Sequence, residues 1–183
     1  MKIGIAISGL IAAALVALIV LWFTPLGTAP LTALFPTGPV ATIDFSQVTI
    51  GRGGHASLVC PNAQLCPDRH DGTSVYDADM NKMKAAWTAA MKSEPRSRLV
   101  HSDEPVHQYT YMIRSVMWRM PDLITVQFVD QSDRRLLLGR DADRTTLAVY
   151  SRSLYGVIDF DTNSARVRRL LGFLDSHLDT YKR

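Results

Sequence analysis

The sequence has only two cysteines among its 183 residues, and it carries little excess charge of either sign. Two cysteines are too few for the disulfide-rich scaffolds that small secreted proteins use in place of a large core. The formal net charge of +3 comes from basic residues scattered among acidic ones, so the composition does not indicate a nucleic-acid partner. Internal repeats and a glycine-rich phosphate loop are missing as well. With 47% hydrophobic residues, the chain is expected to fold as one domain after its N-terminal region.

A long apolar run opens the chain. Residues 3–23 contain no charge and no proline, and Ser8 is their only polar side chain. A helix of this length rises about 1.5 Å per residue and would span about 31 Å, close to the roughly 30 Å hydrocarbon core of a bilayer. The alternative is a cleaved signal peptide, whose apolar region usually runs about 7 to 15 residues. Because the positive-inside rule assigns Lys2 to the cytoplasm, we expect the rest of the chain to be exported.

The next segment, residues 24–42, is apolar but rich in proline and glycine. These residues disfavour a second spanning helix and a regular strand, so we interpret the segment as a linker near the membrane surface. The predicted organisation is therefore a transmembrane anchor at 1–23, a Pro/Gly-rich linker at 24–42 and a soluble domain at 43–183.

Two amphipathic helices are predicted, one on each side of a central region in the soluble domain. Asp77 or Asp79 can cap the first helix, and Pro95 ends it. Each helix has an apolar stripe at a spacing of three to four residues, which is typical of a face packed on a core. The stripes consist of Met80, Met83, Trp87, Ala90 and Met91 in the first helix and Val167, Leu170, Leu171, Leu174 and Leu178 in the second.

Three stretches between the helices are rich in β-branched and aromatic residues, and polar breaks separate them: 109–115, 123–129 and 145–153. Residues 99–101 are a candidate fourth strand, and 130–144 are predicted to form a long hairpin connection with a short extension at 136–138. A helix, consecutive strands and a helix, without βαβ alternation, predict an α+β fold. We expect a small antiparallel sheet packed with two helices and preceded by one N-terminal transmembrane helix.

Three segments in the C-terminal half carry a resemblance to a known family. They read YMIRS at 111–115, RMPDLITV at 119–126 and AVYSRSLYG at 148–156, and Asp159, Asn163 and Arg166 continue the match. In these motifs the chain resembles the bacterial and plastid proteins grouped as domain of unknown function 1499. The region around the two cysteines and Arg96 are also similar. The resemblance implies a shared fold and a grouping, but it supplies no reaction.

The chain departs from the family pattern at two positions. Met120 stands where the family usually has phenylalanine, which is a conservative core change. Asp161 stands where the family usually has glycine, so the turn before the last helix is predicted to be shaped differently here. This departure weakens any role that the resemblance would assign to Asn163.

Cys60 and Cys66 are expected to form a disulfide, because an exported domain meets an oxidising compartment. Closing a loop of this size would stabilise the fold by roughly 2 kcal/mol in the chain-entropy picture. One alternative adds His55 and His70 to make a zinc site with two nitrogen and two sulfur ligands, although the spacing matches no standard zinc motif. Two unpaired thiols are the remaining alternative.

Arginines gather in and beside the resembling motifs. Guanidinium groups at sheet edges and at a helix start would suit a carboxylate, a phosphate or a lipid head group. The competing interpretation is internal pairing of these arginines with nearby aspartates, which would hold loops in place. The candidate ligand-binding residues are Arg114, Ser115, Arg119, Asp122, Ser151, Arg152, Ser153, Asp159, Asn163 and Arg166.

The alternative function is a cell-envelope enzyme of unassigned chemistry, for which a hydrolase using serine, histidine and aspartate is the form considered. The sequence Ser-Arg-Ser-Leu-Tyr-Gly lacks the Gly-x-Ser-x-Gly turn of a nucleophile elbow, so no residue is predicted to be catalytic. A hydroxyl row on one face of a strand explains the two serines equally well, because side chains alternate with a period of two. The hydrolase would use Ser151 or Ser153 as nucleophile, His101 or His107 as base and Asp122 or Asp159 as the orienting carboxylate.

The leading prediction is a non-enzymatic module tethered to the bacterial inner membrane by a single helix, with its C-terminal domain in the periplasm. Its expected partners are the lipid bilayer, through the N-terminal helix, and an anionic ligand or an envelope protein. No cofactor, metal or nucleic acid is expected.

Overall fold

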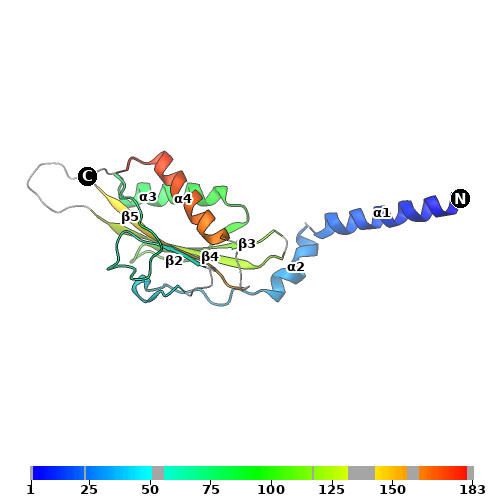
Figure 1. Ribbon diagram of the computed structural model, residues 1–183, viewed down its shortest axis with the longest axis horizontal. Coiled ribbons are helices and arrows are strands. Elements are labelled where there is room, and N and C mark those ends of the chain that lie inside the picture. Colours follow the sequence, from blue (N-terminus) through cyan, green and yellow to red (C-terminus); the bar gives the residue numbers. More distant parts are fainter. Residues whose placement is uncertain are drawn as a thin grey trace, which may run out of the picture.

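A long helix extends away from a sheet that carries two further helices on one face (Figure 1). The computed structural model describes residues 2–22, 24–50, 56–116, 118–131, 143–155 and 161–180; for 2–9, 25–28 and 31 it describes the backbone only. The predicted extension at 136–138 lies outside these residues.

The N-terminal region contains two helices, α1 (Lys2–Trp22) and α2 (Pro25–Leu34). Thr24 ends α1, since both its N–H and its hydroxyl donate to the Leu21 carbonyl, at 3.0 and 2.6 Å. Over the described part of the chain, no helix combines the length and the apolar character needed to cross a membrane.

Helix α2 was not foreseen in the proline-rich linker. Pro25 suits the first position of a helix, because its fixed φ is helical and an N–H at that position has no partner within the helix. Pro30 removes one backbone hydrogen bond from the interior of a ten-residue helix, which still forms.

Five antiparallel strands form one sheet in the order β1-β5-β4-β3-β2. The predicted α+β architecture is therefore confirmed for the domain, and each of the three main predicted strands is present. The candidate fourth strand is longer than expected and contains a bulge between Leu99 and His101. The sequence analysis missed β1, a four-residue edge strand. The strands are β1 (Ala56–Val59), β2 (Ser97–Asp103), β3 (Gln108–Arg114), β4 (Pro121–Asp130) and β5 (Thr145–Ser153).

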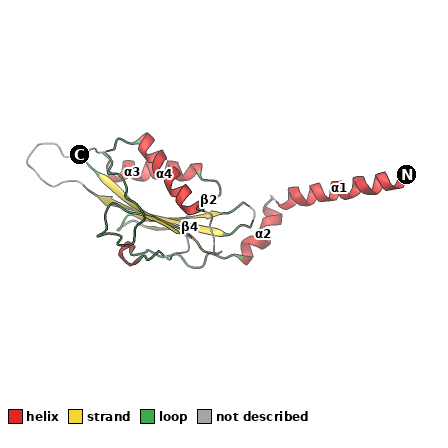
Figure 2. Cartoon of the chain, viewed as in Figure 1, coloured by secondary structure: helices red, strands yellow, loops and turns green. Residues whose placement is uncertain are grey.

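Helices α3 (Met80–Ser93) and α4 (Thr162–His177) cover one face of the sheet, which we call the helix face (Figure 2). Of the two predicted caps for α3, Asp79 is the one used, since its carboxylate accepts the N–H of Lys82 at 2.6 Å. The predicted apolar stripes pack on the sheet, although Leu171 is only half-buried and Leu178 follows the last turn of α4. The largest buried side chains of this core are Trp87, Tyr76, Met83, Met91, Ile124, Leu147, Leu170 and Leu174.

The opposite face, which we call the loop face, is covered by the chain before β1 and by the cysteine loop. Phe45, in a short 3-10 helix (Phe45–Gln47), packs with Leu58 and Ala148 in a second small core. The fully buried Gln108 side chain holds this segment, since its oxygen accepts the Ile43 N–H at 2.8 Å and its amide nitrogen donates to the Ile43 carbonyl at 2.9 Å. The amide thus supplies the two bonds that a neighbouring strand would otherwise supply.

The chain leaves α2 at one end of the sheet, which we call the proximal end. There the Arg114 guanidinium donates to the Phe35 carbonyl at 3.0 Å, and the Tyr155 hydroxyl donates to the Pro36 carbonyl at 2.6 Å. The rings of Phe35 and Tyr155 meet edge to face at 5.2 Å. Contacts with the domain therefore begin inside the predicted linker. We call the opposite end, where β2 and β4 finish and β5 starts, the distal end.

Candidate functional site

Five of the candidate residues meet beneath the start of α4, on the helix face. The Ser151 hydroxyl donates to the Asn163 side-chain oxygen at 2.5 Å, and the Asn163 amide donates to the Ser153 hydroxyl at 3.1 Å. Arg166 donates to the same Asn163 oxygen at 2.9 Å and to Asp122 at 2.8 Å. The Ser153 hydroxyl donates to the other Asp122 oxygen at 2.7 Å. We call this set, together with Glu94 and Arg169, the α4 network.

Glu94 joins the network, and the sequence analysis missed it. Its carboxylate is buried, accepts from Arg169 at 2.8 Å and lies 3.9 Å from the Nε of Arg166. Two carboxylates therefore face two guanidinium groups, so the network is electrically balanced and leaves no surplus charge for an anionic ligand. A signal was available, because an acidic residue at the C-terminal end of a helix opposes the helix dipole unless a cation holds it.

The other arginine candidates lie elsewhere. Arg152 stands between Ser151 and Ser153 on β5 and therefore points to the loop face, where its guanidinium lies 5.5 Å from the centre of the Tyr150 ring. Arg114 and Arg119 belong to the proximal end, where Arg114 also donates to the Arg119 carbonyl at 2.6 Å. The predicted arginine surface is thus two separate groups of residues. Asp159 lies outside the described residues.

Ser115 has a role within the turn between β3 and β4. Its N–H donates to the Met120 carbonyl at 3.0 Å, and its hydroxyl accepts the Met120 N–H at 3.1 Å. Arg119 adopts a positive φ of 55° in the same turn, a conformation that is costly for a side chain other than glycine. These contacts hold the turn in one shape.

The proximal end carries arginines that the described residues do not neutralise. The ion pairs found in the described part of the chain involve none of them. Burial lowers the pKa of Arg114, and the neighbouring Arg98 charge lowers it further, so two like charges lie close together at this end. The Nε of Arg119 is shielded from solvent and has no hydrogen-bond partner among the described residues. We call Arg96, Arg98, Arg114, Arg119 and Arg152 the proximal arginines.

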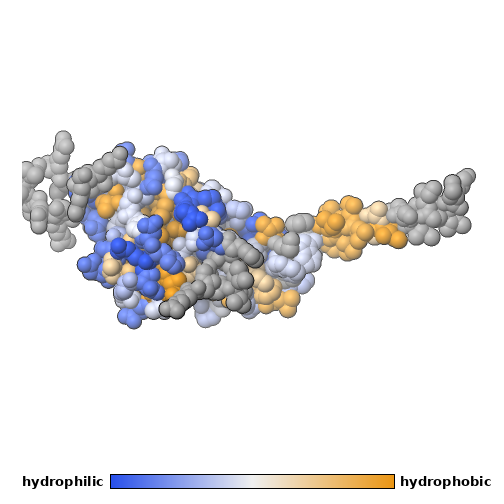
Figure 3. All heavy atoms as spheres, viewed as in Figure 1, coloured by the Kyte–Doolittle hydropathy of each residue, from blue (hydrophilic) through white to orange (hydrophobic). Residues whose placement is uncertain are grey.

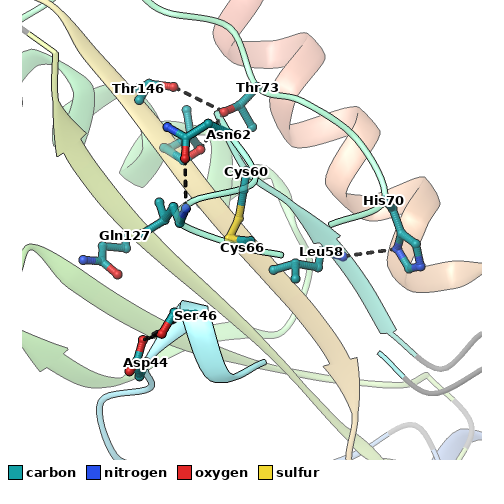
Figure 4. The surroundings of a disulfide bond; sticks show 12 residues. Asp44, Ser46, Leu58, Cys60, Asn62, Cys66, His70, Thr73, Gln127 and Thr146 are labelled. Carbon is teal, nitrogen blue, oxygen red and sulfur yellow. Dashed lines mark hydrogen bonds between the residues drawn. A yellow bond between two sulfur atoms is a disulfide. The ribbon is translucent and has the colours of Figure 1, made fainter. Parts of the chain in front are cut away.

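Cys60 and Cys66 are joined in a disulfide, as predicted (Figure 4). Both are fully buried in the second core, and Asn62 closes the loop by accepting the Leu65 N–H at 2.9 Å. Bonded sulfurs are not thiolates, so the pair does not supply the two sulfur ligands of the alternative zinc site. His70 lies beside Leu58, whose N–H donates to its Nδ1 at 3.4 Å, and His55 is outside the described residues. No cluster of three or more metal-binding side chains occurs within the described ranges.

The structure brings Ser153 and Asp122 of the alternative hydrolase together, but neither candidate histidine lies near the serines. His107 precedes β3 at the level of Leu147 on β5, two strands away and four residues from Ser151, which amounts to roughly 16 Å. His101 lies on β2, three strands from β5 or about 14 Å, and its ring contacts Thr42 instead. Ser151 is fully buried, so a substrate could not reach its hydroxyl.

The turn before α4 was predicted to be shaped differently, because Asp161 stands where the resembling family usually has glycine. This residue has φ 64° and ψ 14°, the left-handed conformation that glycine adopts most readily. At this position the aspartate therefore keeps a backbone shape that glycine would also take. Asn163 is fully buried and bonded in the α4 network, so the departure at 161 does not remove it from the site.

Buried tyrosines predict how stability depends on alkaline pH. Burial and the hydrogen bond to Asp175 raise the pKa of Tyr76 far above its usual value, and burial also raises the pKa of Tyr111. Above about pH 10 the unfolded chain loses these protons while the folded chain keeps them, so the free energy of unfolding should fall by up to about 1.4 kcal/mol per pH unit for each such group.

Tyr76→Phe should reduce the slope of this decrease in the free energy of unfolding with pH. Urea unfolding between pH 8 and pH 11, pH values at which a tyrosine of ordinary pKa near 10 goes from protonated to ionised, would measure it. Ionisation of Tyr76 in the folded protein near pH 10, seen by absorbance, would contradict the prediction.

Comparisons with known proteins do not identify this chain. No model of a known protein family matches it. A search among curated proteins likewise finds no significant relative. The functional conclusions below therefore come from the chain's own residues.

Proposed function

We propose that this protein is a membrane-tethered, extracytoplasmic domain that acts as an interaction or ligand-binding module in the envelope of a bacterial cell. The observation that carries the proposal is the buried Cys60–Cys66 disulfide in a domain preceded by an apolar helix. Disulfides of this kind persist in oxidising compartments such as the periplasm and are rare in the cytosol.

The anchor is α1. Its 21 residues would rise about 31 Å, which matches the hydrocarbon core of a bilayer. The described part of its surface is apolar and exposed, with no domain surface packed on it (Figure 3). A soluble protein gains nothing from such a projecting surface, whereas a lipid environment would bury it. Lys2 on its N-terminal side favours the orientation in which the domain leaves the cytoplasm.

The hydrogen bonds and ion pairs of the candidate residues favour binding over catalysis. The serines, Asp122 and Asn163 are hydrogen-bonded to one another, and Arg166 is compensated within the α4 network. The proximal arginines, by contrast, lack carboxylate partners in the described part of the chain. Unpaired guanidinium groups near a surface are suited to an anionic ligand.

Membership of the family called domain of unknown function 1499 is part of the same proposal. The residues that carry the resemblance include five members of the α4 network: Asp122, Ser151, Ser153, Asn163 and Arg166. A buried network that joins β4, β5 and α4 is a physical reason for several related chains to share these residues. The resemblance then reflects a common fold rather than a common reaction.

Reporter fusions would test location. A C-terminal fusion to alkaline phosphatase should be active in a bacterial host, while a fusion to green fluorescent protein exported by the same route should stay dark. The matched control is the same pair of fusions to a chain that lacks residues 1–23, which should give the reverse pattern. Fluorescence of the full-length fusion in the cytosol would overturn the proposed location.

The hydrolase alternative is tested by a fluorophosphonate probe, which labels activated serines. We expect no labelling of the folded protein, because Ser151 is buried and no histidine contacts Ser153 within the described residues. Labelling that disappears in Ser153→Ala would favour the hydrolase.

A further inference from the structure

We propose that the proximal end of the sheet docks on an anionic lipid surface, so that the domain lies against the membrane in one orientation. The docking elements are the turn between β3 and β4 and the proximal arginines. This inference rests on the proposed membrane anchor and deepens it, by assigning a second contact between the protein and the bilayer.

The turn presents large apolar side chains to solvent. Val116 is 51% exposed and Trp118 is 52% exposed, at the tip of a turn that Ser115 holds in shape. Leu34, at the end of α2, is 68% exposed at the same end of the sheet. Tryptophan is enriched where a membrane meets water, because its ring is apolar and its N–H remains in the polar layer. An exposed apolar tip therefore fits the interfacial region of a bilayer.

Charge is divided between the two ends of the sheet. The proximal arginines have no carboxylate partner in the described residues, and burial and the nearby Arg98 charge lower the pKa of Arg114. Among the described residues, carboxylates gather at the distal end, at the strand ends, in the β2–β3 turn and at the start of α3, where Lys84 pairs with one of them, Glu104, at 2.8 Å. An anionic surface would therefore attract the proximal end more strongly than the distal end. The distal carboxylates are Asp79, Asp103, Glu104, Asp130 and Asp143.

The tether brings the proximal end to the membrane. Twelve residues, 23–34, lie between the end of α1 and Phe35, and ten of them form α2, which rises about 15 Å at 1.5 Å per residue. Phe35 and Pro36 are bonded to Arg114 and Tyr155, which fixes the exit point beside the arginines (Figure 1). Since a short tether gives a high effective concentration, individually weak contacts with lipid suffice to hold the domain down.

The exposed apolar tip and the arginines around it favour a lipid surface over a protein partner. The apolar tip is small, while the cations spread over several strands and continue to the point where the anchor arrives. A protein partner would be expected to meet a larger contiguous apolar core. Lipid head groups and the interfacial layer supply a diffuse negative charge beside a surface that accepts tryptophan.

The test places a spin label at the tip of the turn in the full-length protein. Both native cysteines are bonded, so Val116→Cys introduces the one reactive thiol. The labelled protein is reconstituted in vesicles of phosphatidylcholine, or of phosphatidylcholine mixed with phosphatidylglycerol. Contact of the label with lipid-soluble oxygen and with a water-soluble nickel complex reports its depth. We expect the label to enter the interface in the anionic vesicles and to return to water at high salt, because salt screens the attraction.

Matched variants separate charge from other effects. Arg98→Gln should weaken docking by about fivefold, which is the effect of one basic residue near an anionic surface. Lys82→Gln removes an exposed cation of the distal end and should leave docking unchanged, and a label at Ser102→Cys should stay in water.

A label at position 116 that remains in water in both kinds of vesicle, or that is equally buried in both, would overturn the proposal. A label that is buried only in native membranes would assign this end to a protein partner instead and would also overturn it. Failure of the anchor itself would be recognised separately, as extraction of the chain from vesicles by alkaline carbonate.

Discussion

Replacing Arg166 by methionine is expected to lower the free energy of unfolding by about 3 to 5 kcal/mol, which is typical of breaking a buried ion pair. The side chain is 5% exposed and lies between Asp122 and Glu94, both of which it helps to neutralise. Methionine fills similar volume but leaves Asp122 without its cation. The loss should appear in thermal or urea unfolding of the full-length protein.

Arg168→Met is the matched control, because Arg168 is two residues away on α4 with its side chain 68% exposed. This change should alter stability by less than about 0.5 kcal/mol. Adding Asp122→Asn to Arg166→Met should cost less than the sum of the two single changes, since the residues are bonded partners. A loss of under about 1 kcal/mol for Arg166→Met would mean that the network is open to water, and Arg166 would return as a candidate ligand site.

Replacing both cysteines by alanine is expected to cost about 2 to 4 kcal/mol of stability. Loop closure over a separation of six residues contributes roughly 2 kcal/mol, and the lost sulfur atoms leave space beside Phe45 and Leu58 in the second core. Alanine is preferred to serine in this test, because a serine hydroxyl would be buried without a designed partner.

A reductant provides the internal control for the disulfide. It should lower the midpoint of unfolding of the natural chain and leave the Cys60→Ala/Cys66→Ala variant unchanged. An equal response of both chains would place the effect outside the disulfide. No response of the natural chain, with mass spectrometry showing free thiols from the start, would contradict the bonded pair and remove the main support for an exported domain.

The candidate residues at 151–153 belong to two separate groups, the α4 network and the proximal arginines. Ser151, Arg152 and Ser153 are consecutive, but a strand sends alternate side chains to opposite faces. The serines therefore join α4, whereas Arg152 joins the loop face. This separation follows from the period of a strand, so it could have been predicted once the strand at 145–153 was accepted.

Features that depend on neighbours in the chain could be predicted from the amino-acid sequence. Helical spacing of Met83, Trp87 and Met91 is enough to define a buried face, and Asp79 lies where a cap is needed. β-branched and aromatic runs likewise defined the three central strands, and the absence of βαβ alternation defined an antiparallel sheet.

The pairing of charged side chains could not be predicted, because it depends on how the helices pack on the sheet. Arg166 pairs with Asp122 across 44 residues of sequence, and Arg169 pairs with Glu94 across 75. Such partners leave no local pattern, because their proximity is created by packing α3 and α4 on the same sheet face. The short strand β1 and the Gln108 clamp on Ile43 were hidden for the same reason, since each is stabilised by a segment distant in sequence.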